Sequence, residues 1–218
     1  MTPTRLALAL AAALITVTPA HAYILTADGH NVAGEGQYTN IAAATTFNFN
    51  DGFLPSGYTG GSIVFGSNGN SASPPGDTTG YLNEGSTYGS STTINFGTAL
   101  SYFGFFYGSP DTYNSLQLFK GNSLLATFTG TDFAALISHS ADGNQGLGSY
   151  VNIFAQSTSE QFNRIVLKSD GNAFETDNHA VIAVPEPETY AVLVTGLLMA
   201  GGMFRRRAAK SAPVATQL

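Results

Sequence analysis

The sequence predicts an all-β domain, an antiparallel β-sandwich of jelly-roll type, with a signal helix before it and a short transmembrane helix after it. Short segments rich in Phe, Tyr, Ile, Val and Thr alternate with segments rich in Gly, Asn, Ser and Asp. The first group of residues favours strands and the second favours turns. No internal repeat of fixed period is present, and about nine short strands in one domain favour a sandwich.

The expected strands lie between residues 45 and 183. They are residues 45–49, 61–65, 91–96, 102–107, 115–120, 123–129, 149–154, 163–167 and 179–183. The clearest hairpin signal is Lys120-Gly121-Asn122, because a glycine-containing turn there separates two apolar runs.

Two other segments differ from the strand pattern. Residues 131–138 predict a short helix, with Thr131 or Asp132 as the N-cap. Residues 67–80 contain Asn-Gly and Pro-Pro-Gly and almost no apolar side chains. We therefore expect a long exposed loop there.

Residues 1–22 have the order of a secretory signal peptide. Arg5 precedes an apolar run over residues 6–17, and the small residues Ala20 and Ala22 fit the narrow pockets of a signal peptidase. Cleavage at this site would begin the mature chain at Tyr23. A retained helix is disfavoured, because the run is shorter than the ~20 residues that span a membrane.

The other end of the chain has a second processing pattern. Pro185 and Pro187 flank Glu186, and the two prolines keep this stretch extended and uncovered, as a processing enzyme requires. The apolar residues 190–204 would form a helix of about 22 Å, shorter than a ~30 Å hydrocarbon core. Such a helix is a weak permanent anchor.

Basic residues follow this apolar stretch directly. Arg205, Arg206 and Arg207 hold that end on the cytoplasmic side of a membrane, so residues 211–218 are expected to be a cytoplasmic tail. Residues 23–183 would then form an ectodomain on the opposite side.

The order of a Pro-Glu-Pro motif, a short glycine-containing helix and an arginine cluster resembles the PEP-CTERM sorting signal of exosortase systems. The resemblance covers residues 184–210. It implies transient anchoring in the inner membrane of a Gram-negative bacterium, cleavage by an exosortase, and delivery to the cell surface or an exopolysaccharide matrix. This logic is similar to that of a GPI signal, whose hydrophobic tail is absent from the product. A single-pass anchor that is never cut is the alternative.

The net charge of the ectodomain argues against some classes of binding partner. It has twelve acidic residues against Lys120, Arg164 and Lys168, a net charge of −9. Such a surface repels phosphate backbones and anionic lipid, which argues against nucleic acid and peripheral membrane binding. The chain has no cysteine, so neither disulfides nor thiolate metal sites are available.

The central stretch, from Phe96 to about Ile182, also resembles ectodomains found in front of this sorting signal. This resemblance implies a sandwich fold and no particular substrate. The segments that carry it are residues 108–116, 126–130, 143–145, 150–152 and 173–178.

Catalytic patterns are weak, so we expect no enzyme activity. No Gly-x-Ser-x-Gly elbow is present, and His30, His139 and His179 are expected at the surface or on edge strands. Paired carboxylates of a glycan-acting hydrolase would have to come from the acidic residues of the ectodomain, and spacing alone does not bring them together. The carboxylates considered are Glu35, Glu84, Glu160 and Glu175.

A structural calcium ion is the one cofactor that the sequence suggests. Glu175 and Asp177 occupy alternate positions, so both would point to one face of an extended segment, and calcium takes six to eight oxygen ligands. The alternative is a solvated strand entry with Asn178 closing a turn. The Asp-Gly sequences at Asp142 and Asp170 favour structural turns over metal-binding loops.

Aromatic side chains could bind sugars. In residues 102–107 one set of rings must face the core, and the other set is covered or forms a platform. Better candidates for exposed glycan contact are the tyrosines in polar segments, which are Tyr58, Tyr81, Tyr88 and Tyr113. We expect a structural or adhesive surface or matrix protein without catalysis; the alternative is a polysaccharide-binding module.

Overall fold

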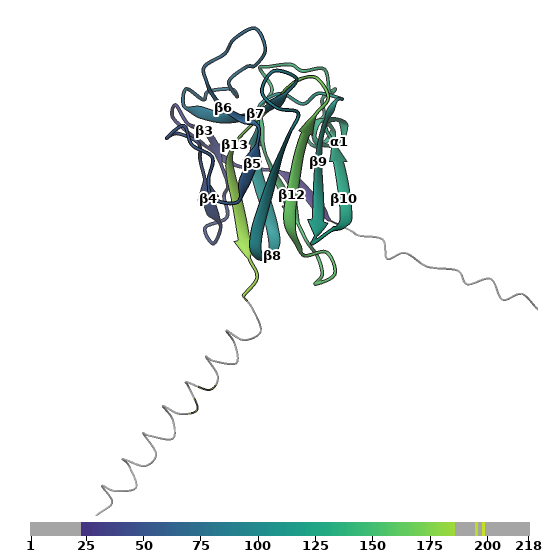
Figure 1. The fold of residues 1–218 in the computed structure, drawn as a ribbon. Helices are drawn as coiled ribbons and strands as arrows, with labels where there is room; N and C mark the ends of the chain where they lie inside the picture. Colours follow the sequence, from purple (N-terminus) through teal and green to yellow (C-terminus); the bar gives the residue numbers. More distant parts are fainter. Residues whose placement is uncertain (1–22, 186–194, 196–197, 199–218) are drawn as a thin grey trace, which may run out of the picture.

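The computed structural model describes residues 23–185, 195 and 198, and residues 23–185 form an antiparallel β domain with one short helix (Figure 1). The strands and helix of this part are β1 (Ile24–Ala27), β2 (His30–Val32), β3 (Gly36–Tyr38), β4 (Thr45–Phe47), β5 (Tyr58–Gly60), β6 (Ser62–Phe65), β7 (Gly80–Gly85), β8 (Ser91–Tyr107), β9 (Asn114–Lys120), β10 (Ser123–Thr129), α1 (Gly130–Leu136), β11 (Ser149–Phe154), β12 (Phe162–Ser169) and β13 (Asn172–Ala183). The all-β prediction is confirmed.

The long strand β8 belongs to both layers of the domain. Its first half pairs with β12 on one side and β5 on the other, which extends the order β10-β9-β12-β8. Its second half pairs with β11 and β13. Leu118 and Ile165 of the first layer pack in one buried cluster with Phe105 and Ile153 of the second. This cluster is the core between the layers.

Both faces of residues 102–107 are covered. Phe103 and Phe105 lie in the core between the layers, whereas Tyr102 and Phe106 form a second buried cluster with Tyr150 on the outer face. The segment that begins with β2 and β3 covers this cluster, and Thr39 shares a hydrogen bond of 2.8 Å with the Tyr102 hydroxyl. These rings therefore offer no platform for a sugar.

The strand boundaries differ from the prediction at several places. Residues 91–96 and 102–107 belong to the single strand β8 rather than to two strands, and β1, β2, β3, β5 and β7 were not predicted. The hairpin prediction is confirmed, because Ser123 pairs with Lys120 across a two-residue turn. Gly121 has φ 57° there, which favours glycine.

The predicted helix is present but begins earlier. Thr129 is the N-cap, and Asp132, one of the two expected caps, is instead the third helical residue of a capping box with Thr129. Phe133 packs edge-on against Tyr107. The helix is therefore tied to the end of β8.

The loop at residues 67–80 is only partly exposed, contrary to expectation. Ser71, Ala72 and Asp77 are buried, because the Ala72 N–H donates to the Glu175 carboxylate (3.0 Å) and the neighbouring Thr78 N–H donates to the Gly34 carbonyl (2.9 Å). Polar backbone groups thus dock a segment that lacks apolar side chains.

Several predicted segments lie outside the described residues. They are the signal segment 1–22 with Ala20 and Ala22, and at the other end Glu186, Pro187, the stretch 190–204 apart from residues 195 and 198, and Arg205, Arg206 and Arg207. Within the described part of the chain, no helix has the length and apolar character that a membrane crossing needs.

Candidate functional site

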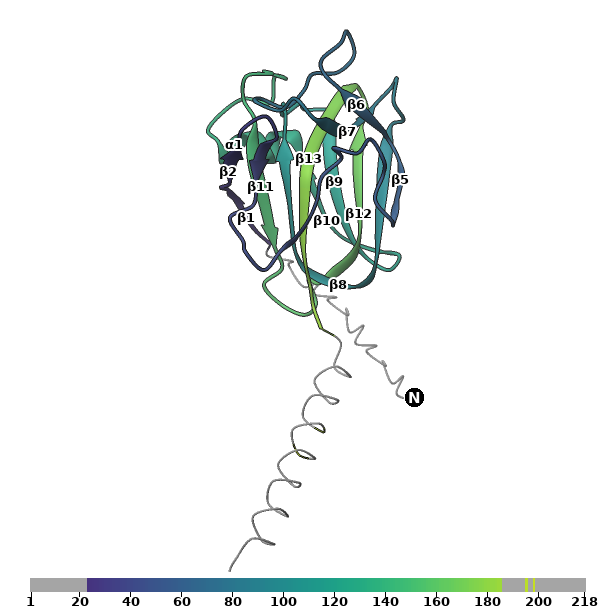
Figure 2. The ribbon, with the colours of Figure 1, turned by 90° about the vertical axis from the view of Figure 1, so that its left-hand side faces the viewer.

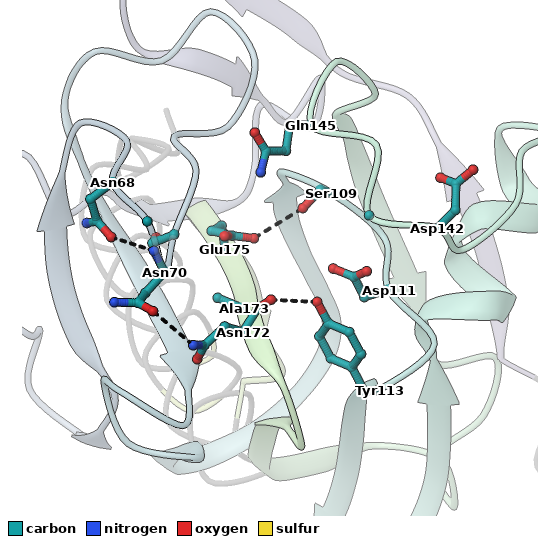
Figure 3. A pocket seen from close by; sticks show the side chains of 13 residues that line it. Asn68, Asn70, Ser109, Asp111, Tyr113, Asp142, Gln145, Asn172, Ala173 and Glu175 are labelled. Atoms are coloured by element: carbon teal, nitrogen blue, oxygen red, sulfur yellow. Dashed lines mark hydrogen bonds between the residues drawn. The ribbon is translucent and has the colours of Figure 1, made fainter.

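A cavity of about 250 Å³ opens at the end of the domain where β8 ends and β13 begins (Figure 3). We call it the polar cleft, because ten of its thirteen lining residues have polar side chains. Four segments line it: the loop after β6, the segment after β8, the loop after α1 and the start of β13. The lining residues are Asn68, Gly69, Asn70, Ser71, Ser109, Asp111, Tyr113, Asp142, Gly143, Gln145, Asn172, Ala173 and Glu175.

Backbone contacts hold Asp111 in place. Its N–H donates to the Tyr107 hydroxyl (3.3 Å), and its carbonyl accepts from the Asn114 N–H (3.1 Å). The buried Gly130 of α1 packs so closely on the Asp111 backbone that a Cβ there would collide with it. The Asp111 side chain is 8% exposed and lines the cleft.

Tyr113 forms one wall of the cleft. Its hydroxyl donates to the Asn172 carbonyl (2.6 Å), and its ring packs against Gly171, where a Cβ would lie 2.9 Å from ring carbons. The ring is partly exposed. A tyrosine held at its hydroxyl and along one face offers the remaining ring surface to a ligand.

Amides occupy the other side of the cleft. The Asn172 side chain donates to Asn70 Oδ1 (3.3 Å), and the Asn68 Oδ1 accepts from the Asn70 N–H (2.9 Å). The Tyr88 hydroxyl also donates to Asn68 Oδ1 (3.1 Å). These bonds order side chains that can both donate and accept hydrogen bonds.

The carboxyl groups of the cleft are perturbed by burial. Burial raises the pKa of Glu175, and the donors Ala72 N–H and Ser109 hydroxyl (3.2 Å) oppose this shift. The pKa of Asp111 is also raised, mainly by burial and further by the negative charge of Asp142, while the Tyr113 hydroxyl opposes the shift. Both acids therefore bind protons more tightly than exposed carboxylates do.

Two of the four predicted glycan-contact tyrosines are buried, which corrects that prediction. Tyr58 is in β5 and packs against Phe49 in the core, and Tyr81 is in β7 with its hydroxyl bonded to Ser71. Both are strand residues rather than loop residues. Tyr88 does not line the cleft but supports Asn68, and Tyr113 does line it.

The two expected calcium ligands have different surroundings. Glu175 lines the cleft, whereas Asp177 is fully buried outside the cleft lining, accepts from the Asn178 N–H (2.7 Å) and faces Asp77. Among the described residues, no group of three or more His, Asp or Glu side chains is placed to hold a metal ion.

Asn178 was expected as an alternative to close a turn, and this is wrong. It lies inside β13 at a bulge, with φ 51°, fully buried. Its side chain donates to the carbonyls of Glu35 (2.7 Å) and Gln37 (3.1 Å). The residue thus fastens β3 to β13.

The histidine prediction is confirmed for His30 and His139, which are exposed, and wrong for His179. His179 is fully buried and stacks on Tyr58. Desolvation lowers its pKa to about 3, so it is neutral in the core.

Sequence reasoning missed most of the cleft. Asn68, Asp111 and Gln145 were not predicted as site residues, since isolated polar residues in turns are common. A signal was available, because residues 108–116, 143–145 and 173–178, which carry the resemblance to other ectodomains, meet at the cleft.

Comparisons with known proteins assign no family. No family model and no curated protein matches the chain. One solved structure, the catalytic domain of a GH87 alpha-1,3-glucanase variant in complex with tetrasaccharides, is similar at 10% identity and a TM-score of 0.38. The match covers 66% of this chain and 29% of that one, so this chain spans less than a third of its length. A likeness this distant supports no inference about activity or ligand.

The prediction that the chain is not an enzyme is nevertheless corrected. The similar structure is a catalytic domain, so the prediction of no catalysis is withdrawn, and the distant likeness assigns no activity to this chain. The polar cleft is also concave and contains two carboxyl groups whose pKa burial raises, Asp111 and Glu175. The sequence-based exclusion rested on the missing Gly-x-Ser-x-Gly elbow and on carboxylates whose separations sequence does not set, and neither shows which side chains meet in the fold.

Proposed function

We propose that this chain is an exported bacterial surface protein that binds polysaccharide in the polar cleft. The lining of the cleft is the observation that carries the proposal. Sugar hydroxyls both donate and accept hydrogen bonds, and the amides of Asn68, Asn70 and Asn172 with the carboxylates of the cleft supply matching partners. The partly exposed Tyr113 ring adds a surface for the apolar face of a sugar ring.

The position of the cleft supports a surface role. Asn172, at the start of β13, lines the cleft, whereas the chain leaves the domain after Ala183, at the other end of that strand (Figure 2). Twelve extended residues span about 40 Å at ~3.3 Å each. Ile24 of β1 pairs with Phe154 at that same far end. Attachment through the C-terminal segment would therefore leave the cleft facing outward.

The expectations about the two ends of the chain, its location and its sandwich type are also part of this proposal. We propose that residues 1–22 are removed by a signal peptidase and that residues 184–210 are a PEP-CTERM signal read by an exosortase. The product would reside at the cell surface or in an exopolysaccharide matrix, where glycan binding makes it adhesive. We also propose that the sandwich is of jelly-roll type.

Substituting the sorting motif tests the export pathway. In the native host we expect a released product that ends near Val184, and we expect the variant Pro185→Ala/Glu186→Ala/Pro187→Ala to abolish it. Pro185 is exposed and directly follows Val184, whose N–H donates to the Ala99 carbonyl (2.8 Å), so cleavage would fall at the edge of the domain. Intact mass of the membrane and released fractions measures this, with Pro213→Ala as control. A wild-type chain that keeps Arg205 to Leu218 in the membrane would refute exosortase processing.

Removing the Tyr113 ring tests the cleft. We expect Tyr113→Ala to weaken polysaccharide binding about tenfold, equivalent to ~1.4 kcal/mol, because the wall of the cleft is lost. Calorimetric titration with exopolysaccharide fragments measures the affinity. Phe53→Ala removes an aromatic ring that is 73% exposed and outside the cleft, and it serves as the matched control. Equal affinities of the two variants would contradict binding in the cleft.

A second candidate function is glycan hydrolysis. Two carboxyl groups in one cleft, Asp111 and Glu175, each with a pKa raised by burial, favour it, since glycosidases use a pair of carboxyl groups. Assaying the same titration samples for newly formed reducing ends distinguishes hydrolysis from binding alone.

A further inference from the structure

The polar cleft is acidic and has no basic counterpart. Asp111, Asp142 and Glu175 line it, and no Lys or Arg of the described residues does. The described basic side chains are engaged elsewhere: Lys120 donates to the Thr158 carbonyl, Arg164 lies over the Phe119 ring, and Lys168 pairs with Asp170. The cleft therefore has a charge preference built into its lining.

The three carboxyl groups differ in how they are satisfied. Both oxygens of Glu175 accept hydrogen bonds, from the Ala72 N–H and the Ser109 hydroxyl. Asp142 is exposed, and its Oδ1 accepts from the Asn144 N–H (3.3 Å). Neither needs a ligand to complete its hydrogen bonding.

Asp111 is the third carboxyl group. It is only 8% exposed, and no Lys or Arg of the described residues lines the cleft beside it. The neighbouring Tyr113 hydroxyl, which donates to the Asn172 carbonyl (2.6 Å), also lies beside the Asp111 carboxylate and carries no positive charge. Gly143 lies against the carboxylate on another side, where a Cβ would meet Oδ1 at 2.5 Å, and its backbone N–H donates instead to the Pro110 carbonyl. A buried carboxylate without a positive counter-charge is costly, and a bound cation would reduce that cost.

We propose that the polar cleft is specific for glycans that carry free amino groups, such as de-N-acetylated hexosamine polymers, with a sugar ammonium group seated against the Asp111 carboxylate. This rests on the proposed function and names its ligand class. An ammonium group supplies three hydrogen-bond donors and one positive charge. No basic side chain of the described residues lines the cleft to supply that charge to Asp111 and the nearby Asp142. A neutral glycan leaves Asp111 without a counter-charge, and a uronic acid polymer is repelled.

The experiment compares three ligands of equal length on the full-length protein by calorimetric titration at pH 6. They are oligomers of glucosamine, of N-acetylglucosamine and of galacturonic acid. Amino groups with pKa near ~8 are charged at this pH. We expect the glucosamine oligomer to bind at least tenfold more tightly than the acetylated one, with weakening as salt rises, and the galacturonate oligomer to bind weakest.

Variants locate the effect. Asp111→Asn should bring the ratio of glucosamine to N-acetylglucosamine affinity close to one. Asp170→Asn removes the same charge from an exposed position outside the cleft and should keep the wild-type ratio, since its pair with Lys168 is exposed. The ligand series on the wild-type protein needs no variant to fold.

Each contrary outcome is informative. Equal binding of amino and acetylated oligomers overturns the amino-glycan inference while the proposed function stands. Absence of binding by every oligosaccharide and by exopolysaccharide overturns both. An equal loss in Asp111→Asn and Asp170→Asn would show nonspecific attraction to an acidic protein, and loss of binding on chelation would assign Asp111 to a bridging metal ion; either result overturns the inference.

Discussion

In the wild-type protein, Glu84 is expected to lower the free energy of unfolding by on the order of 5 kcal/mol between pH 4 and pH 9, and replacing it with glutamine is expected to remove this loss. Glu84 lies in β7, is fully buried, and neither of its carboxyl oxygens has a hydrogen-bond partner among the described residues. Desolvation raises its pKa to about 8, with a smaller contribution from the charge of Glu175.

The direction follows from which state holds the proton. Below about pH 4.5 the carboxyl group is protonated in the folded and unfolded chains, so Glu84 does not lower the free energy of unfolding there. As pH rises toward 8, the unfolded chain ionises while the folded chain does not, so the free energy of unfolding falls. Glutamine is neutral at every pH and removes this dependence.

Denaturant unfolding at a series of pH values measures the effect. Asp51→Asn removes the same charge at an exposed position and is the matched control. We expect a larger flattening for Glu84→Gln than for Asp51→Asn. If both variants keep the wild-type slope, Glu84 is ionised in the folded protein and the predicted pKa shift is wrong.

Gly130→Ala is expected to destabilise the domain by about 2 kcal/mol and to abolish glycan binding. A Cβ at Gly130 would collide with the Asp111 carbonyl group, and backbone cannot rotate away as a side chain can. Such overpacking costs about 1–3 kcal/mol or more, whereas alanine gains at most about 1 kcal/mol of helix propensity over glycine. The clash therefore decides the sign.

The loss of binding has a separate cause. Relieving the clash must move α1 away from Asp111, and Asp111 lines the polar cleft. Gly97→Ala is the control, because nothing lies within 4 Å of a Cβ at that position in β8. Unfolding and titration measure stability and affinity on both variants. A Gly130→Ala variant with wild-type stability and affinity would show that the segment after β8 is not rigidly placed.

Local sequence patterns predicted secondary structure correctly where residues that are close in sequence also lie close in space. The β9–β10 hairpin, β11 and the short helix could be predicted, because turn chemistry, strand composition and capping act over a few residues. The same reasoning failed for β7, where Glu84 and Asn83 are polar yet fully buried. Composition favours exposure there, and only the pairing of β7 with β13 and β6 overrides it.

The sequence by itself determined the class of the fold, the processing pattern expected at each end and the acidic character of residues 23–183. Periodicity tells which residues share a face of a strand, but not which layer covers that face. Tertiary structure alone decided that Tyr58, Tyr81 and His179 are buried and that β8 serves two layers. It also decided which turns meet: Asp111, Asp142 and Glu175 come from three separate segments, and only the antiparallel pairing of β8 with β11 and β13 brings those segments to one end of the domain.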